Sequence, residues 1–171
     1  ADGTTAISGG AITTVAATGD QTFNDAAVVL GADTTLSGND ITFAGTIESD
    51  STARALTVNS NNSGVTTFGG SVGVASPALA SVITNADGLT RINGGAVTTT
   101  GDQTYNDVAT LGANTTLAGN DITFALTLNS DAPGTPRSLT VNSSGGGITT
   151  FGGTVGGTAA LAQLTTNADG A

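Results

Sequence analysis

The sequence predicts an all-β fold, a right-handed parallel β-helix (β-solenoid) of about eight coils built from two tandem units. Two observations lead to this prediction. Long segments recur at a nearly constant spacing, and between them lie short strand-like bursts separated by Gly, Asn and Asp. A fixed period is typical of architectures in which each unit stacks on its neighbour. Connections between parallel strands of one sheet take the right-handed form.

Five motifs carry the repeat. GDQTFND, GNDITFA, LTVNS, TTFGG and TNADG each return 81 to 83 residues later, the first of them as GDQTYND. These positions divide the chain into repeat unit one, 1–85, and repeat unit two, 86–171, which we expect to form one continuous solenoid. The chain closes with NADGA, which matches the beginning of a unit, so we expect it to be a fragment of a longer array.

The bursts consist of Val, Ile, Thr and Phe, as strands prefer, and no stretch shows the 3.6-residue period of a helix. Paired glycines between them supply the positive φ that tight turns need. One unit divides into four coils of about twenty residues with two or three strands each, as solenoid coils have. The predicted coils are 56–78, 79–101, 102–120 and 121–138. Segments that only one copy contains, 15–17 and 133–134, are expected in loops.

The six aromatic residues form three recurring pairs, which are Phe23 with Tyr105, Phe43 with Phe124, and Phe68 with Phe151. They could form an exposed row that stacks on sugars, or inward anchors of the core. We favour inward anchors, because each ring lies in an apolar burst and little else is large enough to fill a core. The hydroxyl of Tyr105 in place of Phe23 predicts that this one ring lies near the surface.

A string of two immunoglobulin-like β-sandwiches is the alternative architecture. The period is close to the roughly 100 residues of such a domain. The chain has no linker between the copies and no Trp, and its bursts are short and interrupted by Gly, so the solenoid is the better prediction.

The composition limits the partners of the chain. Its net charge is −10, it has no Lys, and its three cations are Arg54, Arg91 and Arg137. A surface that binds nucleic acid needs a basic patch, so we expect no nucleic-acid partner. No apolar run approaches membrane-spanning length, and we expect no direct membrane insertion. Cys is absent, which excludes disulfides within the chain.

The residue types leave few catalytic options. Without His, Cys or Lys, nucleophile–His pairs and His-based metal sites cannot form in this chain. Paired carboxylates remain, but Asp recurs in both units and is better interpreted as a turn residue that caps its own backbone. We therefore predict no enzymatic activity and no catalytic, cofactor-binding or metal-binding residues. The recurring positions are Asp20/Asp102, Asp25/Asp107, Asp40/Asp121, Asp50/Asp131 and Asp87/Asp169.

Calcium is the one cofactor that the turns could suit, because Asp, Asn and backbone oxygens are its preferred ligands. EF-hand spacing and the nine-residue glycine–aspartate repeat are both absent, so calcium stays a weak possibility. Arg54 and Arg137 recur just before LTVNS, where they could bind an anion, but we expect each to pair with Asp50 or Asp131 of its own loop. Runs of Thr could form an ice-binding array; we interpret them as strand residues in ladders.

The succession GNDITFAGTI, LTVNS, VTTFGG, TNADG and GDQTFND resembles the repeats of very large bacterial exoproteins, the filamentous-haemagglutinin-like and autotransporter-passenger-like adhesins. The resemblance covers essentially the whole chain. It implies a right-handed β-helix that forms an extended fibre at the cell surface or beyond.

We therefore expect a structural segment, a stalk or fibre, of an extracellular or cell-surface adhesin. The expected partners are like units stacked end to end, and glycans on host or neighbouring cells. The alternative is a carbohydrate-binding or polysaccharide-degrading β-helix with an exposed groove of carboxylates and rings.

Overall fold

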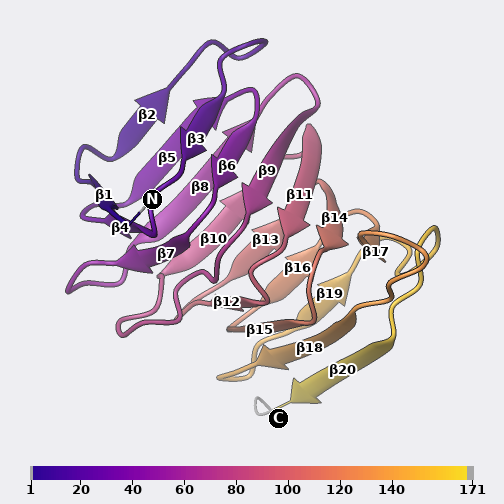
Figure 1. Cartoon of the computed structure of the whole chain (residues 1–171). Helices are drawn as coiled ribbons and strands as arrows, with labels where there is room; N and C mark the ends of the chain where they lie inside the picture. The colour runs from indigo at the N-terminus through magenta and orange to yellow at the C-terminus, as the bar shows by residue number, and fades with distance from the viewer. Residues whose placement is uncertain (1, 169–171) are drawn as a thin grey trace.

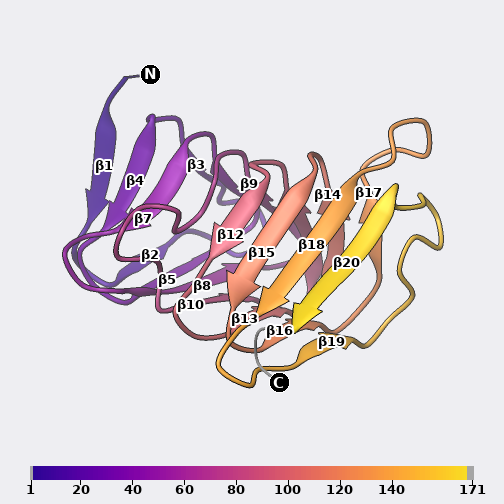
Figure 2. The same ribbon diagram turned by 90° about the horizontal axis from the view of Figure 1, so that it is seen from below.

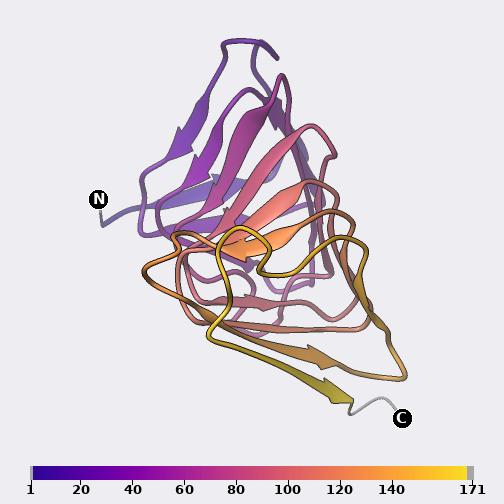
Figure 3. The same cartoon turned by 90° about the vertical axis from the view of Figure 1, so that its right-hand side faces the viewer.

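The computed structural model describes residues 2–168 as one stack of β-strands, in which every paired strand is parallel to its neighbour and no segment is helical. The two ends of the chain lie at opposite ends of the stack (Figure 1). Viewed along the stack, the coils have a three-sided outline (Figure 3). The predicted parallel β-solenoid is therefore confirmed, and the alternative of two sandwiches, which are built from antiparallel sheets, is wrong.

Three sheets form the sides, and the chain visits sheets A, B and C in turn. Sheet A, seen in Figure 2, contains β1 (Thr4–Ile7), β4 (Ala27–Leu30), β7 (Thr46–Ser49), the single bridging residue Val72, β12 (Ala96–Thr98), β15 (Thr115–Gly119), β18 (Ser138–Ser143) and β20 (Gln163–Ala168). Sheet B contains β2 (Ala11–Thr13), β5 (Thr34–Gly38), β8 (Ala55–Ser60), β10 (Ser81–Thr84), β13 (Gln103–Tyr105), β16 (Ile122–Phe124) and β19 (Thr149–Phe151). Sheet C contains β3 (Gln21–Phe23), β6 (Ile41–Phe43), β9 (Gly64–Phe68), β11 (Gly88–Ile92), β14 (Val108–Leu111), β17 (Leu128–Ser130) and the bridging residue Val155.

The repeat does not contain a whole number of turns. The 20 strands, together with Val72 and Val155, which each take the place of a strand in sheets A and C, make 22 segments in residues 2–168. Each unit has 11 of them, and 11 segments at three per turn are 3⅔ turns. Residues 2–168 thus make about seven turns, one fewer than predicted. A segment of unit one consequently reappears in unit two on a different sheet: GDQTF contains β3 of sheet C, and GDQTY contains β13 of sheet B.

The predicted division into coils is right for three coils of the unit and wrong for the fourth. Residues 56–78, 79–101 and 102–120 each cross all three sheets. The segment 121–138 supplies only β16 and β17, and its turn is completed by β18, whose LTVNS belongs to the next copy of the motif. The fourth coil of the unit therefore contributes two strands instead of the three that a full turn needs. As a result, unit two is rotated about the solenoid axis relative to unit one, by one sheet.

The core fills the space between the three sheets. Burial alternates along the strands, because successive side chains of a strand point to opposite faces. The fully buried large side chains include Leu30, Leu36, Ile41, Phe43, Ile47, Leu56, Phe68, Leu79, Ile92, Tyr105, Leu111 and Phe124. This continuous core passes through the boundary between the units without interruption.

The aromatic anchors form two ladders inside the core. Phe23, Phe43 and Phe68 stack on sheet C, with ring centroids 5.0 and 5.9 Å apart. Tyr105, Phe124 and Phe151 stack in the same way on sheet B, at 4.8 and 5.7 Å. The prediction of inward anchors is confirmed. The prediction that Tyr105 lies near the surface is wrong, because its side chain is fully buried.

Glycines line one corner of the coil, where sheet C turns into sheet A. A Cβ on Gly94 would lie 2.0 Å from the carbonyl oxygen of Gly70, and a Cβ on Gly70 would lie 2.4 Å from that of Gly45. Successive backbones therefore approach here more closely than any side chain permits. The recurring Gly-Gly pairs are needed for this contact as well as for turns.

Candidate functional surfaces

The two recurring arginines pair with the aspartates of their own loops, as predicted. Arg54 donates from Nε and Nη2 to both carboxylate oxygens of Asp50, at 3.0 and 2.9 Å. Arg137 makes the same two-pronged contact with Asp131, at 3.0 and 3.2 Å. These hydrogen bonds lower the pKa of both aspartates and raise that of both arginines. Because each guanidinium is already neutralised, neither loop is a ready anion site.

Most of the recurring aspartates within residues 2–168 hold adjacent coils together, and Asp169 lies outside the described residues. Asp20 Oδ1 accepts from the backbone N–H of Asp40 at 3.2 Å, and Asp40 Oδ1 accepts from that of Val65 at 2.8 Å. In unit two, Asp102 and Asp121 make the equivalent bonds, to the N–H groups of Asp121 and Ile148. The expectation that these residues cap their own backbone is therefore wrong for these four, whose partners are 19–27 residues away.

Asp50 in the arginine loop does cap its own backbone, because its Oδ1 accepts from the N–H of Thr52 at 2.9 Å. The hydrogen bonds between coils require an acceptor oxygen, and the oxygen does not have to be charged. Asp33 accepts from the N–H of Ala55 at 3.0 Å, and its counterpart Asn114 accepts from that of Ser138 at the same distance.

Among the residues that the structure describes, Asp107 is the one aspartate that the core encloses. It is 1 % exposed, and its Oδ1 accepts from the hydroxyls of Thr84 and Thr90 at 3.0 and 2.8 Å. Its Oδ2 has no hydrogen-bond partner. Burial therefore raises the pKa of Asp107, and the two threonine bonds only partly oppose this shift. The counterpart Asp25, in the first coil, is only half-buried, so the recurrence of the motif does not predict this burial.

Residues of the threonine runs divide between the core and the surface. In each Thr-Thr pair inside a strand the two side chains point to opposite faces, so Thr34 and Thr66 are buried and their neighbours face outward. The outward residues of sheet B stack in register along the solenoid as Thr35, Thr57, Ile83, Thr104, Thr123 and Thr150. This single row confirms that the threonines form a ladder.

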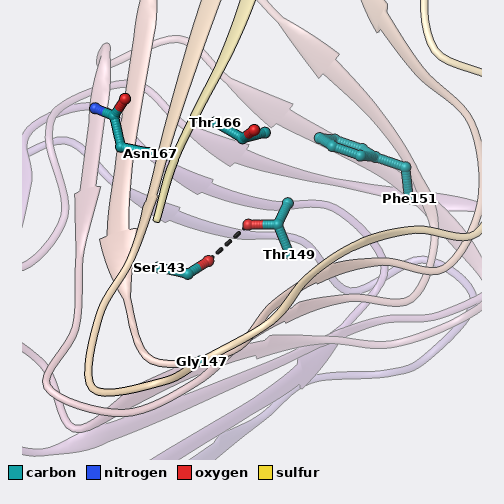
Figure 4. Close-up of a pocket in the computed structure, with 6 residues that line it drawn as sticks. All are labelled: Ser143, Gly147, Thr149, Phe151, Thr166 and Asn167. Atoms are coloured by element: carbon teal, nitrogen blue, oxygen red, sulfur yellow. Dashed lines mark hydrogen bonds between the residues drawn. The ribbon is translucent and has the colours of Figure 1, made fainter. Parts of the chain in front are cut away.

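The surface is hollowed on sheet C and at the C-terminal end of the stack. The hollow on sheet C, of about 390 Å³, is lined by Leu89, Arg91, Asn93, Thr110 and Asp131. The other, of about 330 Å³, opens at the C-terminal end of the stack and is lined by Ser143, Gly147, Thr149, Phe151, Thr166 and Asn167 (Figure 4). Arg91 is exposed, and its counterpart in unit one is Ala6, so the first hollow is not a feature of the repeat.

Within residues 2–168 no group of three or more acidic side chains is arranged to hold a metal ion, and the expectation that the chain has no metal-binding residues stays a prediction. The same residues contain no helix of the length and apolarity needed to cross a membrane. Comparison of the chain with protein-family models, with curated proteins and with solved structures finds no match.

Proposed function

We propose that the chain is a structural segment, a stalk or fibre section, of a large extracellular bacterial surface protein of the adhesin type. The observation that carries the proposal is the continuity of the solenoid across the boundary between its units. β11 of unit two stacks on β9 of unit one with five residues in register, and β13 stacks on β10. A chain that adds units in this way becomes longer without adding a joint.

The side chains at this boundary support the same function. Val82 of unit one and Gln103 of unit two lie in register, and both are fully buried. The boundary is therefore as closely packed as the interior of either unit, and a rod of many units would resist bending at every junction. The recurring aspartates add hydrogen bonds between coils throughout.

The alternative function, carbohydrate binding or degradation, has less support. It depended on exposed rings, and four of the six rings are fully buried in the two ladders. The other two, Phe23 and Phe151, are half-buried at the ends of the stack. We propose that contacts with host or neighbouring-cell glycans involve parts of the protein other than these sheets.

The proposal predicts the length of longer arrays. Tandem chains of two, four and six units would be compared by small-angle scattering and electron microscopy. At about 4.8 Å per coil, 3⅔ coils add about 18 Å for each unit, in a straight rod of constant width. A cross-section that widens with added units, or a flexible chain of separate bodies, would contradict the stalk.

A further inference from the structure

The three arginines of the chain differ in their surroundings. Arg54 and Arg137 each pair with an aspartate of their own loop. Arg91 is exposed on the outward face of β11, and within residues 2–168 it takes part in no ion pair. A chain with a net charge of −10 thus leaves one guanidinium open to a partner from outside the chain.

Arg91 lies in the hollow of about 390 Å³ on the outer face of sheet C, where β11 and β14 run side by side (Figure 1). Thr110 is its register partner on the next coil and also lines the hollow. Asn93 directly follows the end of β11, and a Cβ on Gly112 would lie 2.1 Å from its Oδ1. The amide of Asn93 therefore lies over the backbone of the next coil.

Most residues that line this hollow differ between the two copies of the repeat. Unit one contains ADGTTAISGG, and the same segment of unit two, 86–95, reads ADGLTRINGG. The three changed positions are those of Leu89, Arg91 and Asn93, all of which line the hollow. Their counterparts are Thr4, Ala6 and Ser8. Unit one forms the equivalent strand β1 without these side chains, so the scaffold does not require them.

The neighbouring coils add further differences at the same hollow. Thr110 of β14 stands where unit one has Val29. The loop that begins at Asp131 is two residues longer than its counterpart, since it contains the additional residues 133–134. Asp131 itself has an aspartate as its counterpart, and it is already paired with Arg137. Four of the five lining residues are therefore specific to unit two, and the fifth carries a charge that is already neutralised.

The hollow changes from apolar to polar along β11. Leu89 lies in register with Val65 and Val108, and these three half-buried side chains form an apolar row on the outward face. Arg91 follows two residues later, and Asn93 follows two residues after that. In an extended strand these four steps span about 13 Å, which separates the apolar row from the amide, with the charge between them.

We propose that this hollow binds a carboxylate that carries an apolar group, which is the chemistry of the C-terminal residue of a peptide and of small free acids of the same kind. The planar guanidinium of Arg91 presents paired N–H donors that match the two oxygens of a carboxylate. The apolar group of the ligand covers the row around Leu89. The amide of Asn93 and the hydroxyl of Thr110 supply hydrogen bonds to the polar part of the ligand beside its carboxylate.

The charge of the hollow favours a carboxylate over a phosphate. One unpaired guanidinium balances one negative charge, whereas a phosphate dianion would bring a second charge close to Asp131. A sugar acid lacks the apolar group, and among the described residues that line the hollow there is no aromatic ring for a sugar to stack on. The inference goes beyond the stalk, which requires no ligand.

The first experiment is an NMR titration of the ¹⁵N-labelled chain with N-acetyl-L-leucine, followed on the Nε–H signals of the arginines. The signal of Arg91 should shift and saturate with a Kd in the millimolar range, as is typical of a ligand of this size. Arg54 and Arg137 are internal controls, because their Nε–H groups already donate to aspartates. Equal shifts of all three signals would indicate a general attraction of carboxylates to arginine and would overturn the site.

Three further probes test the chemistry of the ligand. N-acetyl-L-leucinamide lacks the negative charge and should not bind. Acetate lacks the apolar group and should bind at least about 5-fold more weakly than N-acetyl-L-leucine. Glucuronate carries hydroxyls in place of the apolar group and should bind no better than acetate. Binding of the leucinamide, or tighter binding of glucuronate than of N-acetyl-L-leucine, would contradict the proposed ligand class.

The peptide acetyl-Gly-Gly-Leu, with a free C-terminus, distinguishes the two sources of this chemistry. If it binds at least as tightly as N-acetyl-L-leucine, the hollow accepts the end of a peptide chain. Weaker binding of the peptide would assign the hollow to a free acid. Both results support the shared chemistry, and neither affects the stalk proposal, because the length of joined units does not depend on a ligand.

Variants that introduce the residues of unit one test the lining without a new demand on the scaffold. Arg91→Ala should weaken binding of N-acetyl-L-leucine at least about 10-fold, measured on the backbone N–H of Thr110, since it removes the charge-assisted hydrogen bonds. Leu89→Thr should remove the preference for N-acetyl-L-leucine over acetate. Unchanged backbone signals away from the hollow would confirm that both variants fold.

A displaced arginine is the matched control for the position of the charge. Thr42 lies on the same outward row as Arg91, two coils away. In the background of Arg91→Ala, Thr42→Arg returns a guanidinium to sheet C outside the hollow and should not restore binding. Restoration by this variant, or wild-type binding by Arg91→Ala alone, would show that the hollow is not the site.

Discussion

The hydroxyl of Tyr105 offers a sharp test of the core, because the two copies of the repeat differ there by this one group. Tyr105 donates to Oε1 of Gln103 at 3.0 Å, and both side chains are fully buried. In unit one the counterparts are Phe23 and Gln21, and Oε1 of Gln21 has no partner. Burial raises the pKa of Tyr105, so the phenol remains a neutral donor.

We expect Tyr105→Phe to lower the free energy of unfolding by about 1–2 kcal/mol, since it removes one hydrogen bond and leaves a buried oxygen unpaired. In a chain of this size that corresponds to a fall of about 2–8 °C in Tm. The remaining bonds of Gln103, from Nε2 to the carbonyls of Val97 and Ala118, hold the amide in place. The loss should therefore stay local to one corner.

The reverse change, Phe23→Tyr, should stabilise the protein by up to about 1 kcal/mol, because it supplies the missing donor to Gln21. Phe43→Tyr is the control. It adds the same hydroxyl to the middle ring of the ladder, where Ile41 replaces the glutamine, and should destabilise the fold by about 1–3 kcal/mol. Thermal and urea unfolding would measure all three. The reasoning is refuted if Tyr105→Phe is as stable as the wild type, or if Phe23→Tyr and Phe43→Tyr have the same effect.

Three further predictions concern the corners of the coil. Because burial raises the folded-state pKa of Asp107, its ionised form costs stability above that pKa. Asp107→Asn should therefore stabilise the fold at pH 7, and this advantage should shrink as pH falls through the folded pKa in urea titrations, with Asp25→Asn as the half-buried control. Asp33→Asn should leave the stability measured by calorimetry unchanged, because an amide oxygen can accept the same hydrogen bond. Asp33→Ala should lower the free energy of unfolding by about 1 kcal/mol, because it removes the acceptor. Equal effects of the two variants would show that the acceptor oxygen is not what matters. Gly94→Ala should lower the free energy of unfolding by more than about 2 kcal/mol, because its Cβ would meet backbone atoms of the next coil. Gly134→Ala, where a Cβ would meet nothing, should change it by no more than about 0.5 kcal/mol. A tolerated Gly94→Ala would contradict the close contact.

The sequence was sufficient to predict the solenoid, the strands and the inward rings, because these depend on local patterns that each copy repeats. It was not sufficient to predict the rotation between the units. The sheet to which a strand belongs depends on the number of segments before it, and a single bridging residue such as Val72 counts as much as a six-residue strand such as β8. One strand missing from the fourth coil shifts every later strand by one sheet.

The same limit applies to the candidate sites. Whether Asp107 is buried depends on which strands close over it, and whether Asp20 caps its own turn or the next coil depends on how the coils stack. Neither is encoded within a few residues of the aspartate. The pairing of Arg54 with Asp50 was predictable because both residues lie in one loop.

The fractional turn of the repeat also has a mechanical consequence. A rod whose repeat closed after whole turns would carry all its aromatic ladders on one side and all its long loops along one edge, and it would bend more easily in one direction. Here the ladder moves from sheet C to sheet B between units. After three units, which are 11 turns or about 53 Å, the aromatic ladder would lie on the same sheet again. Over that length a fibre of such units would be equally stiff in every direction.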